Sequence, residues 1–151
     1  MACAKLQEYL EERRVRYVSI KHSPAFTAQE LAAAAHIPGK EVAKTVVVKL
    51  DGEMAMVVLP APEMVRMNHL REETGADTVE LASEDEFKGR FPDCEVGAMP
   101  PFGNLYDMRT LVEESLTEDE EIAFNAGTHT ELIRMSYRDF AEMVQPEVLR
   151  S

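Results

Sequence analysis

Residues 43–59 read AKTVVVKLDGEMAMVVL, and this stretch decides the fold. A β-branched run, Thr45 to Val48, leads to the pair Asp51-Gly52, which is typical of a two-residue hairpin turn. The segment that returns after the turn is apolar without a break from its second residue onward. Continuous apolar strands are usually covered on both faces of a sheet. We therefore predict a central hairpin with strands at Ala43–Leu50 and Glu53–Leu59.

Helices and shorter strands are expected on both sides of the hairpin. Before it, apolar spacing predicts an amphipathic helix at 2–15 and a strand at Tyr17–Ile20, and the capping box Thr27-x-x-Glu30 begins a helix at Ala28–Ala35. After it we expect three helices: one capped by Asn68 and ended by Gly75, one from Ser83 to about Lys88, and one capped by Ser136 that reaches Val144. We also expect strands at 78–81, 111–116, 122–125 and 132–135. Because hairpins are mixed with helices, we predict the α/β class, with a mixed, largely antiparallel sheet flanked by helices.

Length and composition predict one globular domain, residues 1–151. A chain of 151 residues with 45% hydrophobic and 29% charged residues has the size and composition of an ordinary domain. Its two cysteines, Cys3 and Cys94, form no disulfide framework, so we expect reduced thiols. No apolar run approaches the roughly 18 residues of a membrane span. These features predict a cytoplasmic protein with no membrane partner.

The net charge of −12 argues against DNA binding and against non-specific binding of nucleic acid, because affinity for a phosphate backbone comes largely from Lys and Arg. The acid is concentrated in two stretches. Glu72–Glu86 holds seven carboxylates and Glu113–Glu121 holds six, and neither contains a base. We expect both stretches to be solvated and to lie away from any site that binds RNA.

Common cofactor and nucleophile motifs are missing from the sequence. It contains no Gly-x-x-x-x-Gly-Lys loop, no Gly-x-Gly-x-x-Gly fingerprint, no Cys-x-x-Cys, no His-x-x-x-His and no Gly-x-Ser-x-Gly elbow. The four histidines are scattered along the chain. We therefore predict neither a metal site nor a cofactor.

Three features at strand ends are suited to binding or catalysis, and each also has a purely structural explanation. Lys44 opens an apolar strand, where its ammonium either extends to water or donates to a carbonyl or phosphate. The loop Gly97–Gly103, GAMPPFG, is either a rigid connector or a backbone that closely approaches a ligand. Asn125–His129, NAGTH, is either a simple turn or an anion nest at Gly127 beside a proton-transferring His129.

The order of these features resembles the family of YbaK and the prolyl-tRNA synthetase-associated editing domain over nearly the whole chain. The matching stretches are His22-Ser23-Pro24 with Thr27–Ala32, then Ala43–Lys49, then Gly97-x-x-x-Pro101-Phe102-Gly103, then Phe124–Gly127. The resemblance implies a curved central sheet. It also implies hydrolysis of the ester that joins a wrong amino acid to tRNA, commonly the tRNA for proline, with partial reliance on the terminal ribose hydroxyl of the tRNA.

The resemblance also implies which residues act. Lys44 would contact the substrate near the 3′ end of the tRNA, with its ammonium facing the Gly97–Gly103 loop, and His129 would take part in catalysis. The substrate-binding residues that it implies are Gly97, Pro101, Phe102, Asn125 and Gly127. We expect Met99 and Phe102 to cap the amino-acid pocket. Many members have Asp in the strand before the glycine turn, where this chain has Glu113, and this longer acid is left out of the predicted site.

The predicted function is that of a trans-editing aminoacyl-tRNA deacylase. One methylene changes the binding free energy in a pocket by only about 1–3 kcal/mol, so a synthetase also accepts smaller amino acids. A second pocket must then hydrolyse the wrong aminoacyl-tRNA. Alanine is the first expected substrate side chain, followed by cysteine and serine. The expected partners are the acceptor 3′ end of aminoacyl-tRNA and a synthetase that could deliver it. Two alternatives stay open: a non-catalytic aminoacyl- or nucleotide-binding module of the same fold, and an unrelated hydrolase of small esters or amides.

Overall fold

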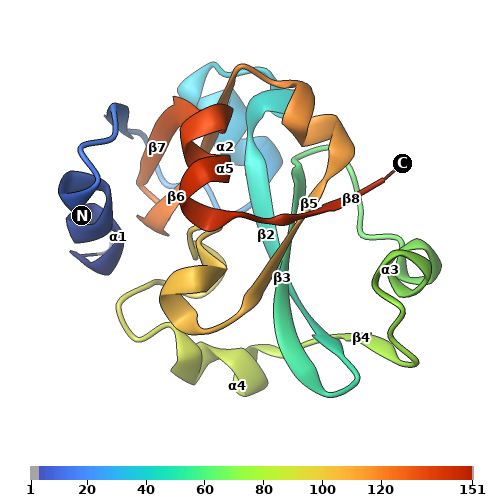
Figure 1. The fold of residues 1–151 in the computed structure, drawn as a ribbon. Coiled ribbons are helices and arrows are strands. Elements are labelled where there is room, and N and C mark those ends of the chain that lie inside the picture. The colour runs from blue at the N-terminus through green and yellow to red at the C-terminus, as the bar shows by residue number, and fades with distance from the viewer. Residues whose placement is uncertain (1–3, 151) are drawn as a thin grey trace.

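The predicted hairpin forms the middle of the larger of two sheets in the computed structural model, which describes residues 4–150 (Figure 1). Strands β2 (Ala43–Leu50) and β3 (Glu53–Pro60) pair antiparallel along their full length. Asp51 and Gly52 both have positive φ, of 51° and 87°, as a two-residue hairpin turn of the primed type requires. β3 is buried from Ala55 to Pro60, which confirms that the hairpin is central and covered.

Three further strands complete this sheet, whose order is β4-β2-β3-β5-β8. β4 (Val79–Leu81) pairs antiparallel with β2, while β5 (Arg109–Glu113) pairs parallel with β3 and β8 (Glu147–Leu149) pairs parallel with β5. The predicted strand at 111–116 was wrong beyond Glu113. The chain turns there into a 3-10 helix, Glu114–Glu118, in which the Thr117 hydroxyl donates to the Glu114 carbonyl over 2.6 Å.

The second sheet has the order β1-β7-β6 and is antiparallel. It consists of β1 (Tyr17–Lys21), β6 (Glu121–Thr128) and β7 (Glu131–Ser136). A parallel bridge between Val42 and Ala123 joins it to the start of β2. Of the six strand pairings in residues 4–150, four are antiparallel and two are parallel. The predicted mixed, largely antiparallel α/β fold is therefore confirmed.

Helices cover both sheets. They are α1 (Ala4–Glu12), α2 (Ala28–Ala35), α3 (Met67–Thr74), α4 (Glu84–Phe87) and α5 (Tyr137–Val144). Figure 1 shows α1 and α5 near the smaller sheet and α3 and α4 beside the larger one. A shared core packs α1 and α5 against the smaller sheet through Leu6, Phe124 and Phe140, which are fully buried. In the part of the chain that is described, no helix has the length and apolar character needed to cross a bilayer.

Helix boundaries followed local capping chemistry in most places. Thr27, Ser83 and Ser136 cap their helices as predicted, the first two through complete capping boxes. The prediction for Asn68 was wrong, because the N-cap of α3 is Arg66, two residues earlier, and the Asn68 side chain accepts from Arg71 over 2.7 Å. α1 ends at Glu12, ahead of Arg14, which has a left-handed backbone with φ of 55°. The predicted start of this helix at residue 2 and the thiol of Cys3 lie outside the described residues.

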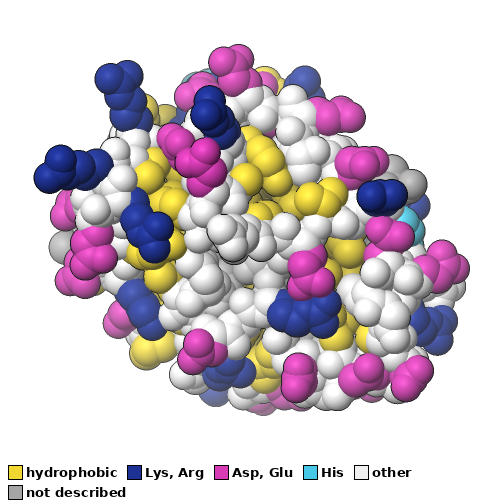
Figure 2. Space-filling model, in the orientation of Figure 1, with side chains coloured by type: hydrophobic (Ala, Val, Ile, Leu, Met, Phe, Trp, Pro, Cys, Tyr) yellow, Lys and Arg dark blue, Asp and Glu magenta, His cyan; other side chains and the backbone are white. Residues whose placement is uncertain are grey.

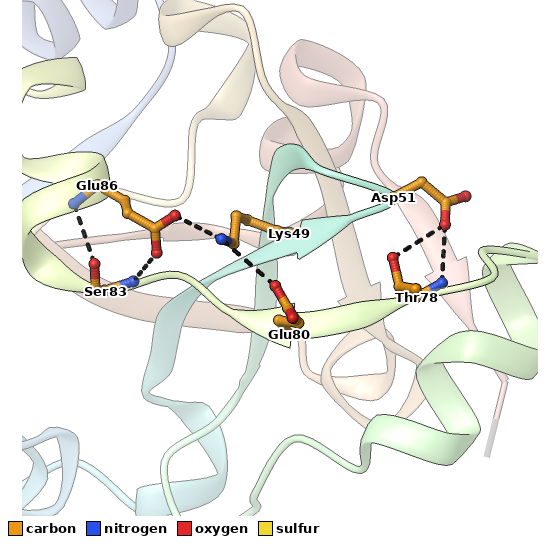
Figure 3. Close-up of polar contacts among 6 residues, drawn as sticks. All are labelled: Lys49, Asp51, Thr78, Glu80, Ser83 and Glu86. Carbon is orange, nitrogen blue, oxygen red and sulfur yellow. Dashed lines mark hydrogen bonds and ion pairs between the residues drawn. The ribbon is translucent and has the colours of Figure 1, made fainter.

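The acidic segment 72–86 is fastened to β2 by polar contacts (Figure 3). The Lys49 ammonium forms ion pairs with Glu80 and Glu86, and the Asp51 carboxylate accepts the backbone N–H of Thr78 over 2.8 Å. The Lys49 hydrogen bond lowers the pKa of Glu86 to about 2, helped by donors at Ser83. This acidic segment is therefore held to β2 by the Lys49 ammonium and by its own Thr78 N–H, which donates to Asp51.

The carboxylates do not gather into one block on the visible surface. Figure 2 shows acidic and basic side chains interspersed over the face that Figure 1 presents. The clearest departure from the expected solvated face is Glu113, at the end of β5, which is only 5% exposed. Burial raises the pKa of its carboxyl, while the charge of Arg66 opposes this shift. The solvated-face prediction for the second acidic stretch was therefore wrong at Glu113, whose place in a central strand removes it from water.

Candidate functional site

A cavity of about 260 Å³ opens where the start of β2, the N-terminus of α2, β6 and the Gly97 loop meet. It is lined by Phe26, Thr27, Ala28, Gln29, Ala43, Lys44, Thr45, Gly97, Met99 and Asn125. Three of the predicted site residues, Lys44, Gly97 and Asn125, are thus brought together from segments up to 81 positions apart in sequence. Three larger surface hollows, of about 570, 580 and 290 Å³, contain none of the predicted residues. The convergence of these side chains, rather than size, marks the smaller cavity as the candidate site.

Lys44 supplies the cation of the cavity. It is the second residue of β2, and its partly buried ammonium donates to the carbonyl of Ala61, just past β3, over 3.1 Å. The ammonium is therefore directed toward the end of β3, and its orientation toward the Gly97 loop stays a prediction. Burial lowers the pKa of Lys44, and the nearby negative charge of Glu63 opposes this shift. Since an ammonium has three protons, two donors remain for a ligand.

The N-terminus of α2 adds backbone donors. The first N–H groups of a helix lack intrahelical partners. Here the Thr27 hydroxyl accepts the N–H of Glu30 over 3.0 Å, and the Glu30 carboxylate accepts the N–H of Thr27 over 3.1 Å. Among residues 4–150, no hydrogen-bond partner is found for the N–H groups of Ala28 and Gln29, two residues that line the cavity. This end of the helix therefore offers donors and a partial positive charge beside Lys44.

Asn125 presents an acceptor to the same cavity. It lies in β6, and its side-chain Oδ1 is buried without a hydrogen-bond partner among the described residues. Buried polar atoms are nearly always paired, and an unpaired one calls for a ligand, water or ion. With Lys44 and the start of α2 as donors, the cavity combines both kinds of hydrogen-bonding group.

Gly127 holds the loop against β6 rather than facing the cavity. Its φ of 100° belongs to a bulge in β6 between Asn125 and Thr128, where we had expected a turn after the strand. The Gly127 N–H donates to the carbonyl of Ala98 over 3.0 Å, and its carbonyl accepts the N–H of Glu95 over 2.8 Å. The predicted anion nest is therefore occupied by the chain itself. The positive φ is used to bring the Gly97 loop alongside β6.

His129 connects the two walls of the cavity. Its Nδ1 lies 3.2 Å from the carbonyl oxygen of Ala25, and its Nε2 lies 2.9 Å from that of Val96. The backbone N–H of His129 donates to the Glu95 carboxylate over 2.7 Å. The ring lies outside the lining of the cavity and presents both nitrogens to backbone carbonyls. Its contacts are those of a brace between the Phe26 segment and the Gly97 loop, and its catalytic role stays a prediction.

Pro101 and Phe102 lie in the protein core. Both are buried, and the Phe102 ring packs against Phe124 and Phe140 with ring centroids 5.5 Å apart in each pair. Neither residue lines the cavity, so Phe102 does not cap it, whereas Met99 does form part of its wall. Gly103, at the end of the same loop, is needed for packing, because an added Cβ would lie 2.6 Å from the Met108 carbonyl oxygen. The loop thus anchors in the core at 101–103 and meets the cavity at 97–99.

Sequence reasoning gave no role in the site to six wall residues, Phe26, Thr27, Ala28, Gln29, Ala43 and Thr45. The first four lie in the stretch around the Thr27 capping box, which carried part of the resemblance without being given a role. A capping box marks a helix N-terminus, but the sequence does not show what that terminus faces. Phe26 is 69% exposed, and this exposure could not be read from the sequence.

Comparison with known proteins identifies the family. Residues 22–143 match the aminoacyl-tRNA editing domain family. The chain belongs to this family. The match includes every residue that lines the cavity, and it confirms the resemblance inferred from the motifs.

Individual relatives agree with this assignment. The Multifunctional Ser/Thr-tRNA deacylase ProXp-y of Escherichia coli (strain K12) is 30% identical over 115 residues, which cover 71% of this chain and 66% of that protein. The proline–tRNA ligase of Bacillus mycoides (strain KBAB4) is 28% identical over 88 residues, and the match spans 58% of this chain but only 15% of the ligase. A crystal structure of a candidate trans-editing enzyme for prolyl tRNA synthetase shares the fold, with a TM-score of 0.81, 19% identity and coverage of 97% and 93%.

Proposed function

We propose that this protein hydrolyses mischarged aminoacyl-tRNA, acting in trans on the tRNA for proline when it carries a small amino acid such as alanine, cysteine or serine. The observation that carries the proposal is the convergence of Lys44, the N-terminus of α2 and Asn125 on one small cavity. Membership of the editing-domain family and the similarity to a Ser/Thr-tRNA deacylase and to a proline–tRNA ligase support it. The expected partners are the acceptor 3′ end and a synthetase that delivers it, in the cytoplasm.

The chemistry needs donors for a developing oxyanion and a positioned water. The ester carbonyl oxygen would take hydrogen bonds from the Lys44 ammonium and the free N–H groups at the start of α2. Water then adds to the carbonyl carbon, the C–O bond to the ribose breaks, and the ribose oxygen leaves with a proton as a hydroxyl group. No cavity-lining side chain is a nucleophile with an adjacent base. The terminal ribose hydroxyl of the tRNA therefore fits the role of orienting the water, as the family resemblance implies.

We infer that the cavity takes a small aminoacyl group and not a drug-sized ligand. Its volume of about 260 Å³ is below the roughly 300–1,000 Å³ typical of sites for drug-sized ligands. The Asn125 Oδ1 would accept a hydrogen bond from the α-ammonium group that every aminoacyl ester carries. Rigid walls exclude larger side chains by steric overlap but reject smaller ones only weakly. Prolyl-tRNA should therefore be spared, while alanyl-, cysteinyl- and seryl-tRNA are cleaved.

A panel of aminoacylated tRNAs tests the proposal. The protein is incubated with Ala-, Cys-, Ser- and Pro-tRNA for proline, and release of the amino acid is followed. Faster cleavage of the first three than of Pro-tRNA supports it, whereas equal cleavage of Pro-tRNA and Ala-tRNA contradicts the size-exclusion model. Binding of these tRNAs without any turnover would favour the non-catalytic module. Equal turnover of amino-acid esters that lack tRNA would favour a general esterase.

A further inference from the structure

Phe26 is an unusually exposed aromatic side chain at the rim of the cavity. It lies directly before the N-cap of α2, and 69% of it is exposed. The other large hydrophobic residues with high exposure in the described part of the chain are Val18, Met64, Leu81, Val96 and Val148, and none of them is aromatic. Phenylalanine is among the residues most often buried, so an exposed ring at the rim of a binding cavity is placed to contact a ligand.

The ring is held in place although it is exposed. One side rests on the His129 ring, with centroids 4.9 Å apart and an interplanar angle of 48°. His129 is itself fixed between the carbonyls of Ala25 and Val96. The backbone is anchored as well, because the Phe26 N–H donates to the Glu30 carboxylate over 3.2 Å and the Ala25 N–H donates to the His129 carbonyl over 3.0 Å. Phe26 is thus a preorganised platform with a supported side and an open side.

We propose that the open side of Phe26 stacks on the base of the terminal nucleotide of the tRNA. This inference rests on the proposed function, because a substrate ester in the cavity places that nucleoside at the rim. Unpaired bases at the ends of RNA are commonly recognised by stacking on aromatic side chains. Such a contact suits a chain with a net charge of −12, since stacking, unlike a phosphate contact, needs no cation. The brace at His129 would then serve to position Phe26 and the Gly97 loop together.

A fluorescence titration tests the stack without any need for turnover. The chain contains no tryptophan, so Phe26→Trp introduces a single indole at the rim. We expect the unacylated RNA 5′-ACCA-3′ to quench its emission saturably, and the same RNA with an abasic terminal nucleotide to bind at least about fivefold more weakly, the smallest loss expected for one base stack. Leu81→Trp, which places an indole at a position 58% exposed on β4, should show no saturable quenching. Equal binding of the two RNAs, or no quenching at all, would overturn the proposal.

Deacylation kinetics provide the second measurement. Phe26→Leu keeps an apolar side chain but removes the ring, and it should raise KM for the cleaved aminoacyl-tRNA at least about fivefold with little change in kcat, whereas Phe26→Tyr should retain the wild-type KM. If the wild-type protein deacylates aminoacyl-tRNA and Phe26→Leu does so with the same KM, the stack is wrong and the proposed function stands. If the wild-type protein cleaves none of the substrates while the titration succeeds, the proposed function fails instead. A loss that occurs only when prolyl-tRNA synthetase is present would assign the ring to a protein contact and overturn the stack.

Discussion

Replacing Lys44 should separate activity from stability. In Lys44→Met the side chain keeps its apolar stem and loses its charge together with the 3.1 Å hydrogen bond to the Ala61 carbonyl. A hydrogen bond to a charged group contributes about 1.5–3 kcal/mol. The cost of desolvating the ammonium opposes this contribution. That cost is larger than the attraction of Glu63, since the two together lower the pKa of Lys44. We therefore expect a net change in the free energy of unfolding below about 1 kcal/mol, or at most about 2–4 °C in Tm.

Activity should respond much more strongly. Loss of one donor to a developing oxyanion costs about 10²–10³ in rate, and a tenfold loss of single-turnover deacylation is the smallest effect compatible with a catalytic role. Lys40→Met, which removes an exposed lysine outside the cavity, is the matched control and should keep the wild-type rate. A wild-type rate in Lys44→Met would remove this ammonium from the mechanism. A fall in Tm well beyond 4 °C would instead show that the variant loses activity because its fold is destabilised.

Further predictions concern packing, pH and the acceptor in the cavity. Gly103→Ala should destabilise the fold by about 1–3 kcal/mol in urea denaturation, because its Cβ would collide with the Met108 carbonyl oxygen; unchanged stability would contradict the structure of this loop. The pKa of Glu86 lies near 2 instead of 4.5, so its ion pair stabilises the fold above pH 4.5, and this contribution is lost as the pH falls through about 2. Lys49→Met should therefore move the acid-unfolding midpoint to higher pH, and an unmoved midpoint would show that the pair adds nothing. Asn125→Leu removes a buried acceptor without a partner and should leave stability equal or higher while deacylation falls at least tenfold; a large loss of stability would mean that the Oδ1 is satisfied in solution.

The sequence predicted those parts of the fold that local chemistry decides. The Asp51-Gly52 turn and the capping boxes at Thr27 and Ser83 each depend on a few neighbouring residues, and each was found where it was predicted. β8, residues 147–149, was missed because a three-residue strand has no readable period and exists only through parallel pairing with β5. The strand predicted at 111–116 failed for a related reason, since an apolar pattern does not show where pairing stops.

The candidate site was predicted in part, and the limit lies in its tertiary contacts. Lys44, Gly97 and Asn125 meet at the cavity as the motifs indicated. Phe102 was assigned to the pocket because it follows Pro101 in a recognised motif, yet only the packing with Phe124 and Phe140 reveals that it is a core residue. A motif identifies residues that belong together without separating those that touch a ligand from those that hold the loop.

The arrangement around Gly127 and His129 explains how the walls of the cavity are fixed to each other. The backbone of the Gly127 bulge bonds to Glu95 and Ala98, and the His129 side chain joins the same loop to the segment that carries Phe26. Hydrogen bonds therefore join the wall proposed to contact the aminoacyl group to the wall proposed to contact the terminal base. A substrate that engages both would meet its full set of donors and acceptors without first ordering a loop, and little binding energy would be lost to conformational entropy. Under the proposed function, such preorganisation would allow a small number of contacts to hold the acceptor end of a tRNA on an acidic chain.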